Sequence, residues 1–234
     1  MSTADLLADH DVEIPPSVVD LSTFREWALS KEFPERGRID FVDGRIEVDM
    51  SPDNIFFHSA PKSELAVAIG NRLSQLDLGE WFVDKTRISC PDANLSVEPD
   101  IVLIRYESFD SGRVSLTPTT NRKPDSFIEI EGPPDLVVEV VSESSVAKDT
   151  RRLRQLYFAA GVAEYWLVDA RGGELHFDIL LPGESEYQSF PADTEGWRRS
   201  AVLMAEYQFT RRRNRHGHWQ YRLNQRDELE GRTT

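Results

Sequence analysis

The chain has 234 residues, 39% of them hydrophobic, and a formal net charge of −14 at pH 7. This length suits one large or two small domains, and the acidic balance argues against a protein that coats DNA nonspecifically. The single cysteine, Cys90, excludes an internal disulfide and a cysteine-based zinc site. Because no apolar run approaches the roughly 18 residues that cross a membrane, and the first residues lack a secretory signal pattern, we expect a cytoplasmic protein with no membrane contact.

The first predicted elements are a helix and a hairpin. Residues 1–20 are acidic, show no clear periodicity and predict an N-terminal arm. A short helix is expected to follow, with Ser22 or Thr23 as its N-cap. The stretch RIDFVDGRIEVDMS (38–51) then alternates around Asp43-Gly44, which is the strongest short-range hairpin signal in the chain.

A longer helix, several strands and another helix come next. Segment 62–77 places leucine and isoleucine at three- and four-residue spacing, which indicates an amphipathic helix. The segments that predict strands are 80–89, 97–104, 125–130 and 135–142. The following helix, 149–162, has Asp149 as its predicted N-cap and Gly161 as its predicted C-cap.

Two further strands, 164–170 and 174–181, complete the regular part of the pattern. The strand at 135–142, the helix after it and the strand at 164–170 form a predicted βαβ crossover. The expected fold class is therefore α/β, with a mixed β-sheet flanked by helices and an N-terminal hairpin. We expect a single domain over residues 21–222 and a flexible tail at 223–234.

A basic and aromatic segment, TRRRNRHGHWQYR (210–222), precedes the predicted tail. Interleaved arginine and aromatic side chains could follow single-stranded nucleic acid. An exposed strand with solvated arginines explains the same pattern and is the preferred interpretation. His216 and His218 could share a metal ion, but no third ligand lies nearby in the sequence, so no metal site is predicted there.

The segment DLVVEVVS (135–142) carries Glu139 among valine residues that fit a strand buried on both faces. A buried carboxylate is costly unless it is paired or holds a metal ion. The candidate partner is Asp100, which follows Pro99 where the apolar strand of VEPDIVLI (97–104) begins. Two carboxylates that meet repel each other, so one of them takes up a proton or a cation lies between them. Oxygen ligands suit Mg²⁺ or Mn²⁺, whereas a turn cap at Asp100 and an arginine beside Glu139 are the alternative.

The wider pattern resembles the Uma-type family of restriction-endonuclease-like proteins, which have the PD-(D/E)XK nuclease fold. The resemblance covers residues 20–181 and is carried by IDFVDGRIEVDMSP (39–52), His58, VEPDIVLI (97–104), PDLVVEVVSESS (134–145), Asp149 to Tyr157 and AAGVAEYWLVD (159–169). It implies a restriction-endonuclease-like core that hydrolyses DNA phosphodiester bonds with a Mg²⁺ or Mn²⁺ ion held by Asp100 and Glu139.

The resemblance also suggests further site residues. The hairpin acids Asp40 and Glu47 are candidate additional metal ligands, although Glu47 also fits a solvated strand position. His58 could orient a water or a phosphate, or could be an ordinary polar residue at the start of a helix. Tyr157 could reach the site through its hydroxyl, but packing in the core with Trp166 is the preferred interpretation.

The sequence departs from the family pattern at the lysine. The motif's own lysine position is Val141, and the helical position from which many family members supply a lysine is Leu153. Lys148 and Arg152 are four residues apart and share a helix face. Arg152 is therefore predicted as the catalytic cation beside the phosphate, with Lys148 as the alternative. An arginine can hold a phosphate but is a poor proton acceptor.

Three functions remain open at this point. The leading hypothesis is a Mg²⁺-dependent DNA endonuclease. The second is a catalytically lapsed domain of the same fold that binds nucleic acid or a protein partner. A metal-free hydrolase that uses the carboxylate pair is the third. The sequence specificity, the choice between DNA and RNA, and the formation of a homodimer are not fixed by the sequence.

Overall fold

The computed structural model describes residues 12–119, 123–189 and 191–227. The helical elements are α1 (Leu21–Ala28), the π-helical turn η1 (Ile55–Ser59), α2 (Ala60–Leu76), the 3₁₀ turn η2 (Pro91–Ala93), α3 (Tyr106–Asp110), the π-helical turn η3 (Lys148–Leu153) and α4 (Arg154–Ala160). The strands are β1 (Arg38–Val42), β2 (Arg45–Asp49), β3 (Gly79–Val83), β4 (Arg87–Cys90), β5 (Leu95–Val97), β6 (Ile101–Arg105), β7 (Ser115–Pro118), β8 (Phe127–Glu131), β9 (Leu136–Val140), β10 (Glu164–Asp169), β11 (His176–Pro182), β12 (Tyr187–Ser189), β13 (Arg198–Ser200), β14 (Ala205–Arg213) and β15 (Trp219–Asp227).

The described strands form three sheets rather than the one mixed sheet that was predicted. The hairpin sheet has the order β2-β1-β5-β4-β8-β7, the central sheet β12-β11-β10-β9-β6-β3, and the terminal sheet β13-β14-β15. The first two are mixed, because β4 and β8 are parallel and so are β9 and β10, while their other pairs are antiparallel. The predicted α/β class with mixed sheets and flanking helices is therefore confirmed.

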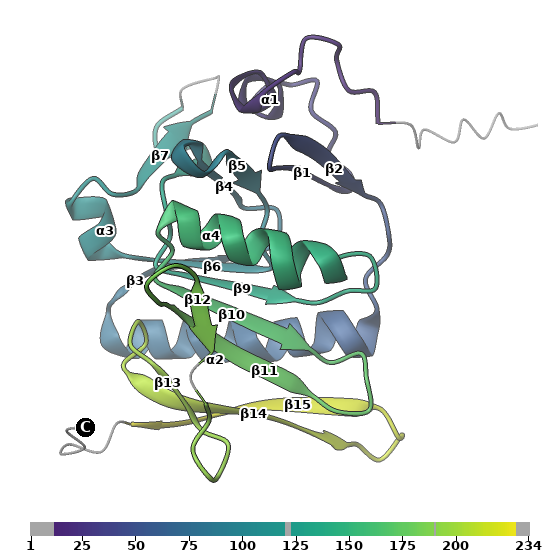
Figure 1. Ribbon diagram of the computed structural model, residues 1–234, viewed down its shortest axis with the longest axis vertical. Helices are drawn as coiled ribbons and strands as arrows, with labels where there is room; N and C mark the ends of the chain where they lie inside the picture. The colour runs from purple at the N-terminus through teal and green to yellow at the C-terminus, as the bar shows by residue number, and fades with distance from the viewer. Residues whose placement is uncertain (1–11, 120–122, 190, 228–234) are drawn as a thin grey trace, which may run out of the picture.

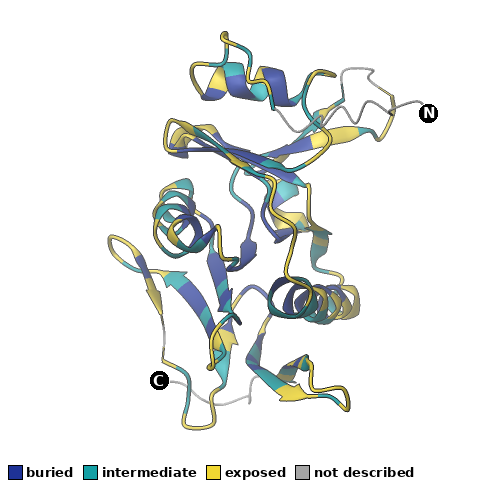
Figure 2. Cartoon of the chain, turned by 90° about the vertical axis from the view of Figure 1, so that its right-hand side faces the viewer, coloured by how far each residue is buried: buried dark blue, intermediate teal, exposed yellow. Residues whose placement is uncertain are grey.

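The helices separate these sheets into layers (Figure 1). Helix α4 lies between the hairpin sheet and the central sheet, where Leu153 and Tyr157 join a core with residues of both sheets. Helix α2 covers the other face of the central sheet, and its Leu65 and Ile69 share a core with the terminal sheet. Helix α1 covers the hairpin sheet through Phe24. Figure 2 shows that the buried residues line these contacts.

The predicted hairpin and the predicted βαβ crossover are both confirmed. Strands β1 and β2 pair as the predicted antiparallel hairpin around Asp43-Gly44, where both residues have positive φ. Strands β9 and β10 are parallel neighbours joined through η3 and α4, which is the predicted βαβ crossover. This crossover positions Glu139 in the middle of the central sheet. No helix among the described residues is long and apolar enough to cross a membrane.

Two predicted strands are each divided in two. Segment 80–89 turns at Asp84 and Lys85, which both have positive φ, so that β3 joins the central sheet and β4 the hairpin sheet. Segment 97–104 is likewise interrupted between β5 and β6 at Pro99 and Asp100. Each division carries the chain from one sheet to the other, and the second one leaves Asp100 between the two sheets.

The predicted helix caps are partly wrong. Asp20, not Ser22 or Thr23, is the N-cap of α1, and its carboxylate accepts from the Thr23 backbone N–H at 2.9 Å. Asp149 is not an N-cap because the helical turn η3 already begins at Lys148.

Of the two predicted C-terminal boundaries, one is confirmed and the other lies farther along the chain. Gly161 ends α4 in the left-handed conformation, as predicted. Strand β15 continues to Asp227, beyond the predicted start of the tail at 223, and residues 228–234 lie outside the described part of the chain, as do residues 1–11 of the predicted arm.

Candidate functional site

Asp100 and Glu139 face each other from neighbouring antiparallel strands. The register of β6 against β9 pairs Ile101 with Val138, so the next step brings Asp100 opposite Glu139. Residues opposite one another project to the same face of a sheet. The backbone N–H of Asp100 donates to Glu139 Oε2 at 3.4 Å, and the N–H of Val140 donates to Asp100 Oδ2 at 2.8 Å. The two carboxyl groups therefore meet.

Three basic side chains surround Asp100. Its Oδ1 lies 2.7 Å from Arg38 Nη2 and 3.6 Å from Lys62 Nζ, and its Oδ2 lies 3.4 Å from His58 Nε2. Burial alone would raise the pKa of this carboxyl, but the His58 contact and the positive charges around it bring the pKa well below its usual range. Asp100 is thus an ionised carboxylate in a fully buried position.

Glu139 is affected in the opposite direction. Its side chain is buried, which raises its pKa well above the usual range, and the charge of Asp100 raises that pKa further. The hydroxyl of Tyr157 donates to Glu139 Oε1 at 2.8 Å. Asp100 and Glu139 thus form an asymmetric pair, in which Glu139 holds its proton far more tightly.

Tyr157 reaches the pair and also packs in the core. Its ring lies at an edge-to-face distance of 5.2 Å from Tyr165. The predicted packing against Trp166 is wrong, because Trp166 belongs to the core on the opposite face of the central sheet. Alternate residues of β10 point to opposite faces, so Tyr165 and Trp166 cannot both face α4.

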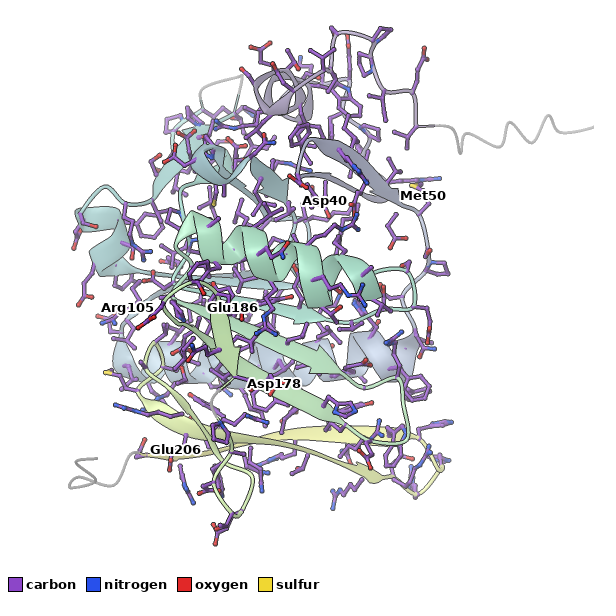
Figure 3. All side chains as sticks on the ribbon, in the orientation of Figure 1. Asp40, Met50, Arg105, Asp178, Glu186 and Glu206 are labelled. Carbon is purple, nitrogen blue, oxygen red and sulfur yellow. The ribbon has the colours of Figure 1, made fainter. Side chains whose placement is uncertain are left out.

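Asp40 and Lys148 form a buried ion pair next to the carboxylate pair. Lys148 Nζ lies 2.9 Å from Asp40 Oδ2, and the backbone N–H of Glu98 donates to Asp40 Oδ1 at 3.0 Å. Burial would lower the pKa of Lys148, but the neighbouring carboxylate of Asp40 outweighs that effect and raises it. The lysine therefore stays charged. Figure 3 labels Asp40 between the β1–β2 hairpin and the helix that carries Lys148.

Asp149 adds a further acidic side chain to this region. Its residue is 1% exposed, and burial raises its pKa to about 7. Its Oδ2 accepts from Ser145 Oγ, while its Oδ1 is buried with no hydrogen-bond partner among the described residues. One oxygen of this buried carboxyl group is thus left without a partner.

Glu47 and Arg152 are paired with each other, away from the carboxylate pair. Arg152 Nη1 lies 2.7 Å from Glu47 Oε1, and the arginine side chain is 38% exposed. Glu47 lies opposite Asp40 in the hairpin register. The two hairpin acids therefore share a face, but each is bound by a different cation of the helical turn η3.

His58 lies in η1, where the Asn54 side chain accepts from the backbone N–H groups of Phe56 and Phe57. Its Nδ1 is 3.1 Å from Asp53 Oδ2, and its Nε2 faces Asp100. Burial would lower the pKa of His58, but its contact with Asp100 outweighs burial and raises it. Lys62, one helical turn later, also contacts Asp53 at 3.1 Å.

Sequence reasoning missed Arg38 and Lys62. Arg38 is two residues before Asp40, so the period of a strand places both on one face of β1. Lys62 is four residues after His58, and this spacing places them on one helix face. Both spacings are visible in the sequence. The sequence does not show that both cations contact Asp100, which lies far from them in the chain.

Two surface clefts open onto this cluster. One has a volume of about 380 Å³ and is lined by Arg38, His58 and Lys62 among others. The other is lined by Arg38, Asp40, Glu47 and Lys148 among others. Arg38 therefore borders both clefts, and the buried Asp100 lies behind this side chain.

No group of three or more His, Cys, Asp or Glu side chains is arranged to hold a metal ion within the described residues. The carboxylate pair thus offers two side chains. Both expected lysine positions are apolar and fully buried, since Val141 and Leu153 are each 0% exposed. Of the two cations predicted to replace that lysine, Lys148 is the one that the fold buries beside Glu139.

A mixed α/β fold with two facing carboxyl groups on neighbouring central strands is what we expected of a restriction-endonuclease-like protein. The family model Uma2, described as "Putative restriction endonuclease", matches residues 21–212. The chain belongs to this family, which confirms the resemblance seen in the sequence.

The structure is also similar to a crystal structure described as "a putative nuclease belonging to DUF820 from Anabaena variabilis ATCC 29413". The two chains are 18% identical, and the match covers 73% of this chain and 94% of the other with a TM-score of 0.49. A comparison with curated proteins gives no match.

Proposed function

We propose that this protein is a divalent-metal-dependent nuclease that hydrolyses DNA phosphodiester bonds. The observation that carries the proposal is the closeness of the buried carboxyl groups of Asp100 and Glu139. Asp100 contacts Arg38, His58 and Lys62, which line a surface cleft. Membership of a family described as "Putative restriction endonuclease" supports the same class of reaction.

The donor set fits a hard divalent cation. Glu139 and Asp149 both have raised pKa values, and Asp149 has an unpartnered buried oxygen, so the region would gain from added positive charge. Mg²⁺ is commonly bound through only one or two carboxylates together with waters and substrate phosphates. Asp100 and Glu139 would hold it, and it would polarise a phosphodiester oxygen and acidify a bound water.

Three side chains set the charge and the orientation of the groups at this position. Arg38 neutralises Asp100 in the absence of an ion, so a cation held at Oδ1 would compete with its guanidinium. Tyr157 fixes the orientation of Glu139 through its hydroxyl. Lys148 supplies a buried, permanently charged group that can stabilise negative charge developing on a phosphate in the water-poor interior.

The geometry favours Lys148 over Arg152 as the catalytic cation. Lys148 is buried, and its charge acts on Glu139, whereas Arg152 is more exposed and bound to Glu47. Arg152 is then a structural partner of the hairpin.

A lapsed member of the family that binds nucleic acid without cleaving it is the second candidate. The two fully buried apolar residues at the lysine positions, Val141 and Leu153, favour it. The difference between the two candidates lies in whether Lys148 can take the place of the family lysine.

A plasmid-nicking assay with Mg²⁺ or Mn²⁺ tests the proposal. We expect wild-type protein to nick DNA, and Lys148→Ala, Asp100→Asn and Glu139→Gln to lower the rate at least about 100-fold, the scale typical of a lost catalytic group. Arg152→Ala, which removes a cation from the same helical turn, should retain activity within about threefold. Nicking that survives both carboxyl variants would contradict the assignment, and a wild type without nicking would favour the lapsed candidate.

A further inference from the structure

The hairpin formed by β14 and β15 has an unusual charge for this protein. The chain carries 41 acidic residues against 27 lysines and arginines, but residues 210–226 contain six arginines and no aspartate or glutamate. We call residues 210–222 of this hairpin the basic hairpin. Such a local positive surface is what an acidic protein needs in order to approach another polyanion.

The outer face of the basic hairpin presents two unpaired arginines. The register pairs Thr210 with Arg222 and Arg212 with Gln220, so these four side chains share one face. Arg212 and Arg222 are diagonal neighbours there and both are exposed. Among the described residues, no carboxylate lies within ion-pair distance of either guanidinium, in contrast to Arg198 and Arg226 of the terminal sheet.

Arg226, farther along β15, shows the contrast. Its guanidinium is bound by Asp193 at 2.6 Å, by Glu195 at 3.2 Å and by Glu206 at 2.6 Å. It lies on the same face as Arg222, because alternate strand residues project to one side. The fold therefore neutralises one arginine of this face and leaves Arg212 and Arg222 available.

A hollow of about 400 Å³ lies at these side chains. It is lined by Glu64, Thr210, Arg211, Arg212, Gln220, Tyr221 and Arg222. Its one acidic residue, Glu64, is a backbone acceptor, since its Oε1 accepts from the N–H of Leu223 at 3.0 Å. The hollow thus combines hydroxyl, amide and guanidinium groups, all of which donate to phosphate oxygens.

The two large aromatic rings of the basic hairpin are already covered. The Trp219 ring lies under Arg211 at 4.2 Å and under Arg213 at 3.7 Å, and the buried Tyr221 ring stacks on Phe209 at 5.6 Å. The smaller His218 ring stacks on Phe56 at 4.3 Å but remains exposed, as does His216. Rings covered by the protein's own side chains are not free to stack on bases. The surface therefore favours contacts with phosphates over the base stacking that single-strand binding requires.

The basic hairpin is attached to the turn that carries a residue of the candidate site. Besides the stack with His218, the backbone carbonyl of Phe56 accepts from the Tyr221 hydroxyl at 2.8 Å. Phe56 is two residues before His58, which contacts Asp100. Figure 1 shows the turn between β14 and β15 on the same side of the molecule as the segment that joins β2 to α2.

We infer that the outer face of the basic hairpin binds the phosphate backbone of double-stranded DNA through Arg212 and Arg222. The inference rests on the proposed function for the choice of DNA. Its physical basis is the pair of exposed, unpartnered guanidinium groups, which two backbone phosphates would neutralise.

The test is the salt dependence of DNA binding, measured by fluorescence anisotropy with a labelled 20-base-pair duplex in EDTA. Each neutralised phosphate contributes a slope of about −0.9 to the logarithm of affinity against the logarithm of salt concentration. We expect the double variant Arg212→Gln/Arg222→Gln to bind at least about tenfold more weakly at low salt and to lose about two units of this slope. The single-residue control Lys31→Gln removes an exposed charge near α1 and should change neither.

Several outcomes would overturn the inference. They are no binding by the wild type, an unchanged slope in the double variant, or an equal loss in Lys31→Gln. A wild type that binds a single strand more tightly than the duplex would also overturn the choice of partner. Because binding is measured without divalent metal, a protein that binds as expected but never nicks DNA would contradict the nuclease proposal and leave the surface standing. Unchanged melting temperatures in the variants exclude unfolding as the cause.

Discussion

Asp100 and Glu139 both carry a buried carboxyl group, but the surroundings of the two groups favour different protonation states. Arg38 and Lys62 lie close to Asp100, whereas no cation of the described residues lies within ion-pair distance of Glu139. The first pKa is therefore lowered and the second raised. A divalent ion at the pair would replace the guanidinium of Arg38 and remove the reason for Glu139 to keep its proton.

Asp149 supplies a prediction at the level of one residue. Its pKa rises from 3.8 to about 7, mainly through burial, which outweighs the opposing charges of Lys148 and Arg38. An acid whose pKa is raised by folding stabilises the folded state fully below its unfolded pKa and loses that contribution as the pH rises through the folded value. We therefore expect wild-type stability to fall between about pH 4 and pH 7, and Asp149→Asn to remove part of that fall.

Urea unfolding at pH 5 and at pH 8 measures this effect. The midpoint of Asp149→Asn relative to wild type should be higher at pH 8 than at pH 5, because asparagine carries no charge and can still accept from Ser145. The exposed Asp92→Asn is the matched control and should follow the wild type. The quantity to compare is the difference in urea midpoint between Asp149→Asn and the wild type. If this difference does not increase from pH 5 to pH 8, the Asp149 carboxyl is ionised at little cost and the prediction is contradicted.

At the scale of elements, the sequence correctly predicts the structures that are determined by residues close together in the chain. The β1–β2 hairpin follows from Asp43-Gly44, and the βαβ crossover follows from an apolar strand, a helical period and a second apolar strand. The division of segment 80–89 was missed because the segment contains no glycine or proline that would mark a turn. Asp84 and Lys85 adopt positive φ there, and this strain is imposed by the two sheets that the segment joins.

Glu164 provides a prediction for the attachment of the terminal sheet to the central sheet. This buried residue of β10 accepts from Trp166 Nε1 at 3.0 Å, from Ser200 Oγ at 2.7 Å and from the Val202 N–H at 2.9 Å. Glu164→Ala would leave buried donors without an acceptor, so we expect a loss of about 3 kcal/mol in the free energy of unfolding. Chemical denaturation measures the loss, and the exposed Glu174→Ala should change stability by less than about 0.5 kcal/mol. Equal stabilities of the two variants would contradict this role.

At the scale of the whole molecule, the site is assembled from segments far apart in the chain. The sequence pointed to Asp100, Glu139, Asp40 and Lys148 as candidates, and the fold brings them into one region. Arg38 could not be assigned because its partner Asp100 is 62 positions away and is reached only when the hairpin sheet packs above the central sheet. The sequence favoured Arg152 over Lys148 as the catalytic cation for a similar reason. The helix face alone does not reveal that Arg152 forms an ion pair with Glu47.

The same dependence on packing explains the basic hairpin. Its charge pattern is visible in the sequence, but whether an arginine is solvated, paired or covering an aromatic ring is decided by the neighbouring sheet. Arg226 is neutralised by three carboxylates, whereas Arg212 and Arg222 are not. Local composition thus located the surface, and tertiary structure selected the residues that can bind a phosphate.

The central claim is that Asp100 and Glu139 together hold a divalent metal ion. The most direct measurement is anomalous diffraction at the manganese absorption edge from crystals grown with Mn²⁺. We expect a peak about 2.1 Å from a carboxylate oxygen of each residue, with the Arg38 guanidinium moved away from Asp100. A structure at saturating Mn²⁺ in which Arg38 remains bound to Asp100, with no peak between the two carboxyl groups, would contradict the claim.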